Sequence, residues 1–141
     1  MRSIALPAAL IALTATIAAA PAHAATPITG RWTTADGAGI VTIAPCGATL
    51  CGRLTTILKH EPGRPTTDVA NKDPALRSRP VLGLPILTGF TDAGSDWRGQ
   101  IYDPRNGKTY KSIVSRNANG TLAVKGCIAF FCQTQTWTAA K

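Results

Sequence analysis

Few residues in this sequence could carry acid–base or nucleophilic chemistry. Beyond residue 24 there is one histidine, His60, and one glutamate, Glu61, and they are neighbours in the chain. Neighbouring side chains rarely aim at one substrate atom, and a general base must come within hydrogen-bonding distance of the proton that it takes. We therefore expect two solvated loop residues here, no catalytic residue, and a protein that is not an enzyme.

Asp68, Asn71 and Asp73 carry the oxygen side chains that calcium prefers. Their segment lacks the glycine turn and the terminal glutamate of a dedicated calcium loop. Asp73 stands directly before Pro74, as a helix cap does, and Asp68 and Asn71 are typical turn residues. The sequence therefore predicts no metal and no cofactor.

The four cysteines form two pairs of equal spacing, Cys46-x4-Cys51 and Cys127-x4-Cys132. An even number of cysteines in an exported chain is typical of disulfides. Zinc is the alternative, but His60 is the one histidine beyond residue 24. Four cysteines allow three connectivities, which the count alone leaves open.

The first 24 residues have the pattern of a signal peptide. Arg2 precedes an apolar run over 4–20, and Ala22-His23-Ala24 is a small-x-small cleavage site. An uncleaved anchor helix is the alternative, which Pro21 and the cleavage site disfavour. We expect a leader over 1–24, a single domain over 25–141 without a transmembrane segment, and a periplasmic or secreted location.

The chain is basic, with 15 lysines and arginines against 7 acidic residues and a formal net charge of +8. An exported protein meets no nucleic acid, so this charge predicts solubility and attraction to an anionic envelope surface. The basic residues are scattered, but Arg77 and Arg79 lie close together in the longest irregular segment. These two arginines are the candidates for contact with an anionic group.

Short β-rich runs separated by Gly, Pro, Asn and Asp turns indicate an all-β domain. The expected strands are 28–35, 40–46, 51–58, 82–90, 95–102, 108–116, 121–128 and 133–139. A loop over 59–79 separates the third strand from the fourth, with one short helical turn at 73–77. Because closure removes sheet edges, we predict an eight-stranded up-and-down antiparallel β-barrel, with a two-sheet sandwich as the alternative. The register of 82–90 stays open, since leucine and isoleucine occupy both faces.

Alternation along the strands predicts which residues face inward. When the tryptophans are placed inward, Cys46, Cys51, Cys127 and Cys132 all fall on the outer face, each pair beside a hairpin turn. Cysteines on one face of a hairpin can form a local bond, so we predict the disulfides Cys46–Cys51 and Cys127–Cys132.

The same alternation places polar groups inside the barrel. Buried amides need partners, and an eight-stranded barrel is wide enough either to be filled by side chains or to hold one small ligand. We predict an inner pocket with Arg77 and Arg79 at its mouth. The predicted ligand-binding residues are Trp32, Trp97, Tyr110, Gln133, Gln135, Trp137, Arg77 and Arg79. The alternative is a filled core in which the amides bond each other or trapped water.

Several segments resemble a known family. They are Gly30 and Trp32, Cys51-Gly52-Arg53, the run from Asp68 to Pro80, the run from Leu82 to Leu87, the run from Tyr102 to Tyr110, and Gln133 to Trp137. Together they resemble the bacterial secreted proteins grouped as domain of unknown function 2147, and Gly30-x-Trp32 is similar to the opening of lipocalins. The resemblance implies a periplasmic or secreted lipocalin-like barrel and carries over no activity.

Two functions follow as expectations. The first is an exported barrel that binds a small hydrophobic or amphipathic, lipid-like ligand. The second is a cell-envelope structural or interaction module with a filled core and a basic surface. The size of a cavity separates them, because ligand pockets usually have volumes of about 300 Å³ or more.

Overall fold

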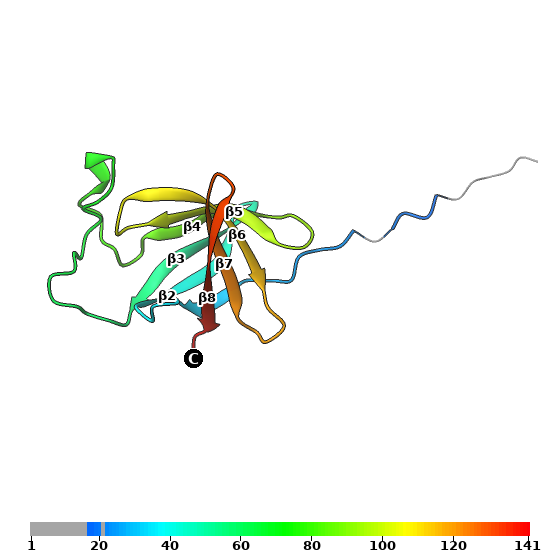
Figure 1. Cartoon of the computed structure of the whole chain (residues 1–141), viewed down its shortest axis with the longest axis horizontal. Coiled ribbons are helices and arrows are strands. Elements are labelled where there is room, and N and C mark those ends of the chain that lie inside the picture. The colour runs from blue at the N-terminus through cyan, green and yellow to red at the C-terminus, as the bar shows by residue number, and fades with distance from the viewer. Residues whose placement is uncertain (1–16, 21) are drawn as a thin grey trace, which may run out of the picture.

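The computed structural model describes residues 17–20 and 22–141 and contains a closed barrel of eight antiparallel strands, each hydrogen-bonded to the next and β8 to β1 (Figure 1). This confirms the predicted up-and-down barrel. The strands are β1 (Gly30–Thr33), β2 (Gly39–Cys46), β3 (Thr49–Ile57), β4 (Pro85–Asp92), β5 (Trp97–Asp103), β6 (Lys108–Arg116), β7 (Leu122–Ile128) and β8 (Phe131–Ala139). No helix within the described ranges has the length and apolar composition needed to cross a bilayer. Most of the predicted leader, 1–16 and residue 21, lies outside the described residues.

Two hairpins are tighter than predicted. β2 and β3 are joined by Gly47 and Ala48 alone, and β7 and β8 by Ala129 and Phe130 alone. Gly47 and Ala129 have positive φ values of 65° and 51°, as two-residue hairpin turns require. β3 and β8 therefore each begin two residues earlier than the sequence indicates, because neither turn carries an Asn-Gly or Asp-Gly signal.

β4 starts at Pro85 rather than at residue 82, and its register contains a bulge. Thr88 pairs with Gln100 but Thr91 pairs with Arg98, and Gly89 between them has a φ of 65°. The extra residue shifts the alternation, so that Leu87 and Phe90 are both buried although they stand three apart. Simple alternation of inward and outward residues therefore does not predict which side of this segment faces the core.

The predicted helical turn between the third and fourth strands is present as the 3₁₀ helix η1 (Pro74–Leu76). The Asp73 side chain caps it by accepting a hydrogen bond from the Ala75 N–H at 2.9 Å. Pro74 occupies the first helical position, where a missing N–H costs nothing. We call the whole connection over 58–84 the long loop; in Figure 1 it projects from the left of the barrel.

The up-and-down order divides the connections between two ends of the barrel. The turns β1–β2, β5–β6 and β7–β8 and the long loop share one end, which we call the open end. The turns β2–β3, β4–β5 and β6–β7 share the other end, where the segment before β1 enters (Figure 1). We call this the closed end, because the entering segment covers it.

Residues 25–28 cover the closed end. Ile28 is fully buried, and its carbonyl accepts a hydrogen bond from Trp32 Nε1 at 2.9 Å. The Thr26 carbonyl accepts one from Trp97 Nε1 at 2.9 Å. Two of the three tryptophans thus fasten this segment to the barrel rather than lining an open pocket.

The core extends from Ile28 at the closed end to Leu84 in the long loop. Trp32 and Trp137 are each 2% exposed and belong to one apolar cluster. The other members are Ile28, Val41, Ile43, Leu50, Leu84, Ile86, Leu87, Phe90, Val114, Leu122 and Val124. Burial of this set is the main source of the barrel's stability.

Both cysteine pairs form local disulfides, as predicted. Cys46–Cys51 joins β2 to β3 at the closed end, and Cys127–Cys132 joins β7 to β8 at the open end, with Cα–Cα distances of 5.8 and 4.0 Å. None of the four side chains is in the buried core, in agreement with the predicted outer face.

Each disulfide closes a small loop, so its removal should weaken the fold without abolishing it. We expect Cys127→Ser with Cys132→Ser to lower the free energy of unfolding by about 2 kcal/mol, the loop-entropy value for a ring of this size. Urea denaturation against the wild type measures this. Cys46→Ser with Cys51→Ser has the same separation and serves as the matched pair; an unfolded protein from either variant would contradict the expectation.

Candidate ligand-binding site at the open end

The predicted ligand residues do not converge on one pocket. Trp32 and Trp137 are packed in the core, whereas Trp97 lies at the closed end. Gln133 and Gln135, predicted to be buried, are exposed. This prediction of burial is wrong because β8 pairs with β1 only through Thr138 and Ala139, so the first half of β8 has no β1 residue paired along its edge.

Gln135 nevertheless has a specific partner. Its Oε1 accepts a hydrogen bond from Trp137 Nε1 at 3.1 Å. The amide therefore satisfies the one polar atom of a tryptophan that is otherwise enclosed by apolar side chains. In this arrangement Gln135 supports the core from the solvent side.

Arg79 is also placed differently from the prediction. Its guanidinium forms a salt bridge with Asp68, with Nη2–Oδ2 and Nε–Oδ2 distances of 2.9 Å. Arg77 donates from Nε to the Asn71 carbonyl at 2.7 Å. Both arginines therefore stabilise the long loop. The prediction that Arg79 meets an anionic head group is wrong, because Asp68 already neutralises its charge.

Asp68 is the centre of a buried polar cluster that fixes the long loop to the barrel. It is 0% exposed and accepts hydrogen bonds from Tyr102 Oη at 2.6 Å and from Asn71 Nδ2 at 2.8 Å, besides those from Arg79. Burial alone would raise the pKa of Asp68, but the hydrogen bonds from Tyr102, Asn71 and Arg79 outweigh it and lower this pKa below the usual value. Burial and the hydrogen bond to Asp68 raise the pKa of the Tyr102 phenol. Asp68 is thus a carboxylate and Tyr102 its neutral donor.

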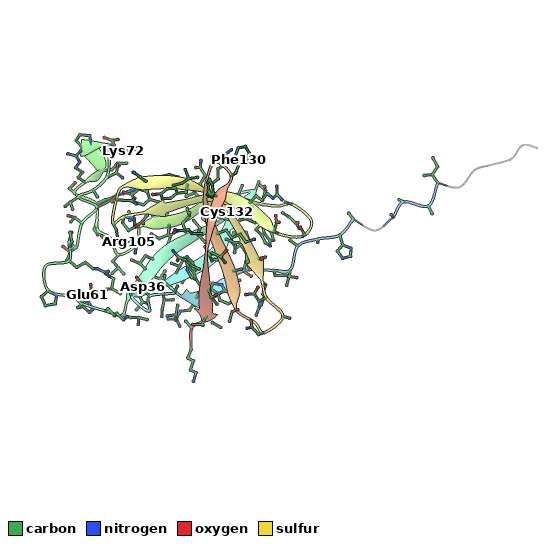
Figure 2. All side chains as sticks on the ribbon, viewed as in Figure 1. Asp36, Glu61, Lys72, Arg105, Phe130 and Cys132 are labelled. Atoms are coloured by element: carbon green, nitrogen blue, oxygen red, sulfur yellow. A yellow bond between two sulfur atoms is a disulfide. The ribbon has the colours of Figure 1, made fainter. Side chains whose placement is uncertain are left out.

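The fixed loop carries Lys72 to the mouth of the barrel, beside a cavity of about 440 Å³ that we call the open-end cavity. Figure 2 shows Lys72 on the loop and Phe130 at the β7–β8 turn, both on the upper side of the view. The residues around the cavity are Lys72, Lys108, Thr109, Tyr110, Lys111, Cys127, Ile128 and Ala129.

The cavity exists because neighbouring strands differ in length. β6 begins at Lys108, but its pairing with β7 begins at Lys111 and Cys127. Residues 108–110 pair only with β5, so a notch opens between the start of β6 and the β7–β8 hairpin. A second hollow of about 280 Å³ lies beside the disulfide Cys127–Cys132 and shares Lys111 with the first.

The open-end cavity is lined by both cationic and apolar side chains. Lys72, Lys108 and Lys111 line it, and the salt bridges found in residues 17–20 and 22–141 all use arginines, none of these lysines. Ile128 is 65% exposed, and the adjacent Phe130 and Phe131 are 98% and 83% exposed. Three ammonium groups without a carboxylate partner beside exposed apolar side chains suit a molecule that is both anionic and apolar.

Tyr110 is the one predicted ligand residue that lines this cavity. It is half-buried, and its hydroxyl accepts a hydrogen bond from Asn106 Nδ2 at 3.0 Å. The sequence did not predict this group of lysines, because Lys72 stands far from Lys108 in the chain and scattered basic residues give no sign that they cluster in space. A usable signal was the apolar Ile128-Ala129-Phe130-Phe131 across a hairpin turn, where polar residues are usual.

The described part of the chain contains no group of three or more His, Cys, Asp or Glu side chains placed to hold a metal ion. Asp68 and Asn71 are occupied with Arg79 and Tyr102, and Asp73 caps η1. The three oxygens considered for calcium therefore serve the loop itself.

Residues 30–139 match a bacterial family described as "uncharacterized protein conserved in bacteria (DUF2147)". The chain belongs to this family. The DUF2147 match begins at the first residue of β1 and ends at the last residue of β8, so it covers the whole barrel and none of the leader.

One solved structure shows the same fold. It is titled "Protein HP1028 from the human pathogen Helicobacter pylori belongs to the lipocalin family". It is 21% identical to this DUF2147 chain, with a TM-score of 0.71 over 82% of this chain and 84% of the other. The likeness shows that the barrel is lipocalin-like. No curated protein matches the sequence.

Proposed function

We propose that this protein is an exported binding protein, not an enzyme, which takes up a small amphipathic molecule with an anionic group at the open-end cavity. The observation that carries the proposal is that Lys72, Lys108 and Lys111 line one cavity together with Ile128. The cavity volume of about 440 Å³ lies within the range of roughly 300–1,000 Å³ that is usual for small-molecule sites. The lipocalin-like fold supports the same conclusion.

The charges and the apolar surface give the proposed ligand an orientation. Its anionic group lies among the lysine ammonium groups, where charge-assisted hydrogen bonds are strongest. Its apolar part lies along the exposed side chains of Ile128 and Phe131. Because Trp32 and Trp137 are packed in the core, the proposed ligand lies at the open end and does not insert between these two tryptophans.

The proposed location is the periplasm or the cell exterior. The signal-peptide pattern at 1–24 supports export. Two disulfides in a chain of this size support an oxidising compartment. In that compartment the partners are small molecules and envelope surfaces.

A second function is favoured by one specific observation, the exposed tip of the β7–β8 hairpin. Phe130 and Phe131 are 98% and 83% exposed and directly follow Ala129, which lines the open-end cavity together with Lys108 and Lys111. Aromatic side chains beside basic residues suit attachment to an anionic lipid surface. In this alternative the hairpin tip binds the membrane and the cavity is only its flank.

The test of the proposed site is a calorimetric titration with decanoate, an anionic amphiphile, and with decanol, its neutral counterpart. We expect Lys108→Gln with Lys111→Gln to weaken decanoate binding about tenfold, or about 1.4 kcal/mol, and to change decanol binding little. Lys125→Gln removes one charge from the outer face of β7 at a residue that does not line the open-end cavity, and it should leave decanoate binding intact.

Two results would contradict the proposed site. One is equal weakening by Lys125→Gln and by either cavity lysine replaced singly, which would indicate attraction by net charge alone. The other is absence of decanoate binding together with binding to anionic lipid vesicles that Phe130→Ser with Phe131→Ser abolishes. That second result would establish membrane attachment in place of ligand uptake.

A further inference from the structure

The polypeptide enters the closed end abruptly at Ala25. Residues 17–20 and 22–24 are exposed, whereas Ala25 is 6% exposed. The Ala25 nitrogen lies 3.0 and 3.1 Å from the two carboxylate oxygens of Asp92, the last residue of β4. A single backbone nitrogen thus faces both oxygens of one carboxylate.

The sequence places a processing site on the same nitrogen. Ala22-His23-Ala24 is a small-x-small motif, and cleavage after it breaks the bond between Ala24 and Ala25. In this hydrolysis the hydroxyl of water adds to the Ala24 carbonyl carbon, the C–N bond breaks, and the Ala25 nitrogen leaves as an amine that takes up a proton. An α-amino group is mostly protonated at neutral pH.

We propose that Asp92 is a binding site for the α-ammonium group of the processed chain, so that removal of the leader completes the closed end of the barrel. Before cleavage the Ala25 nitrogen donates a single N–H as part of a neutral peptide bond. After cleavage it has three N–H donors and a positive charge beside a carboxylate. Hydrogen bonds between charged partners are about twice as strong as neutral ones.

The groups around the Asp92 carboxylate leave it available to the Ala25 nitrogen. The Asp92 carboxylate is held by the Gly94 N–H, which donates to Oδ1 at 2.8 Å. Asp92 has no lysine, arginine or histidine within salt-bridge distance anywhere in the described chain, whereas the neighbouring Asp96 pairs with Arg98. The free carboxylate therefore lacks a cation until the leader is removed.

The next residues fix the register of the amino terminus. Thr26 is held through its carbonyl by Trp97, and Ile28 is buried and held by Trp32. Consecutive Cα atoms are about 3.8 Å apart. A chain that began one residue earlier or later would therefore place its charge out of reach of Asp92.

The test uses the protein exported with its own leader from a bacterial host. Its intact mass should correspond to a chain that begins at Ala25. Insertion of one glycine between Ala24 and Ala25 moves the charge by one residue and keeps an amide N–H at Ala25. We expect the glycine insertion and Asp92→Asn each to lower the melting temperature by roughly 3–6 °C, and the combination to lower it by little more than either alone.

Asp96→Asn is the matched control, because it removes a carboxylate from the same β4–β5 region without touching Ala25. Its effect should add fully to that of the glycine insertion. The proposal is overturned by an exported protein whose mass shows a start other than Ala25, or by additive effects of Asp92→Asn and the insertion. It rests on the closed end alone, so failure of ligand binding at the open end would leave it standing.

Discussion

Replacement of Gly107 by alanine is expected to lower the free energy of unfolding by about 3 kcal/mol or more. Gly107 is buried in the β5–β6 turn with a φ of 68°, and a Cβ built there would overlap the Ala70 carbonyl oxygen. The left-handed conformation costs a side chain about 1–2 kcal/mol, and forced overpacking adds about 1–3 kcal/mol. Because the obstacle is backbone, no rotamer change can relieve it.

Gly120→Ala is the matched control for this prediction. Gly120 also lies in a strand-to-strand turn and has a φ of 85°, but a Cβ there meets nothing within 4 Å. Gly120→Ala should lower the free energy of unfolding only by the conformational cost of about 1–2 kcal/mol. Urea denaturation measures both variants, and equal losses would contradict the close contact between the β5–β6 turn and the long loop.

Asp68→Asn is expected to lower the free energy of unfolding by about 3 kcal/mol, because removal of one partner from a buried ion pair leaves the other uncompensated. The value stands at the lower end of the usual range, since the Arg79 side chain is 31% exposed and can reach water. Asp96→Asn breaks a pair whose arginine is 62% exposed and should cost under about 1 kcal/mol. Similar losses in the two variants would contradict the central role of Asp68.

The effect of Asp68 should also depend on pH. Its pKa is lower in the folded protein than the ordinary value of about 4 that it has when unfolded. The stabilisation is therefore fully present above that ordinary value and is lost as the pH falls through the lower, folded pKa. The difference in unfolding free energy between wild type and Asp68→Asn should be constant near neutrality and shrink in acid. A difference that grows in acid would contradict the assignment.

The barrel was predictable because its signals are local. Eight short runs, a capped helical turn at Pro74, and two cysteine pairs on one face each follow from neighbouring residues. The start of β8 was predicted two residues too late, because Ala129 and Phe130 are not residues typical of a turn. The bulge at Gly89 hid the register of β4, since a single glycine is compatible with either register.

The candidate site was less predictable because it depends on differences in strand length. Alternation correctly puts Gln133 and Gln135 on the inner side of β8, as their pairing with Gly126 and Val124 shows. Alternation cannot indicate that β1 is too short to cover them. Alternation also cannot indicate that Lys72 lies near Lys108 and Lys111. That placement depends on two contacts between the long loop and the barrel, Asp68 with Tyr102 and Ala70 with Gly107. The prediction for Arg77 and Arg79 failed because alternation along strands says nothing about contacts within a loop. Their partners, Asn71 and Asp68, lie in the same loop.

The most direct test of the proposed ligand site is a ¹H–¹⁵N NMR titration of the exported protein with decanoate. The account predicts that the backbone amide signals of Tyr110, Lys111 and Ile128 move, while the indole N–H signals of Trp32 and Trp137 stay in place. Each of these two indoles is held by a hydrogen bond, to the Ile28 carbonyl and to Gln135 respectively, within a filled core. Movement of the two indole signals without change at Tyr110, Lys111 and Ile128 would place the ligand inside the barrel and contradict the open-end site.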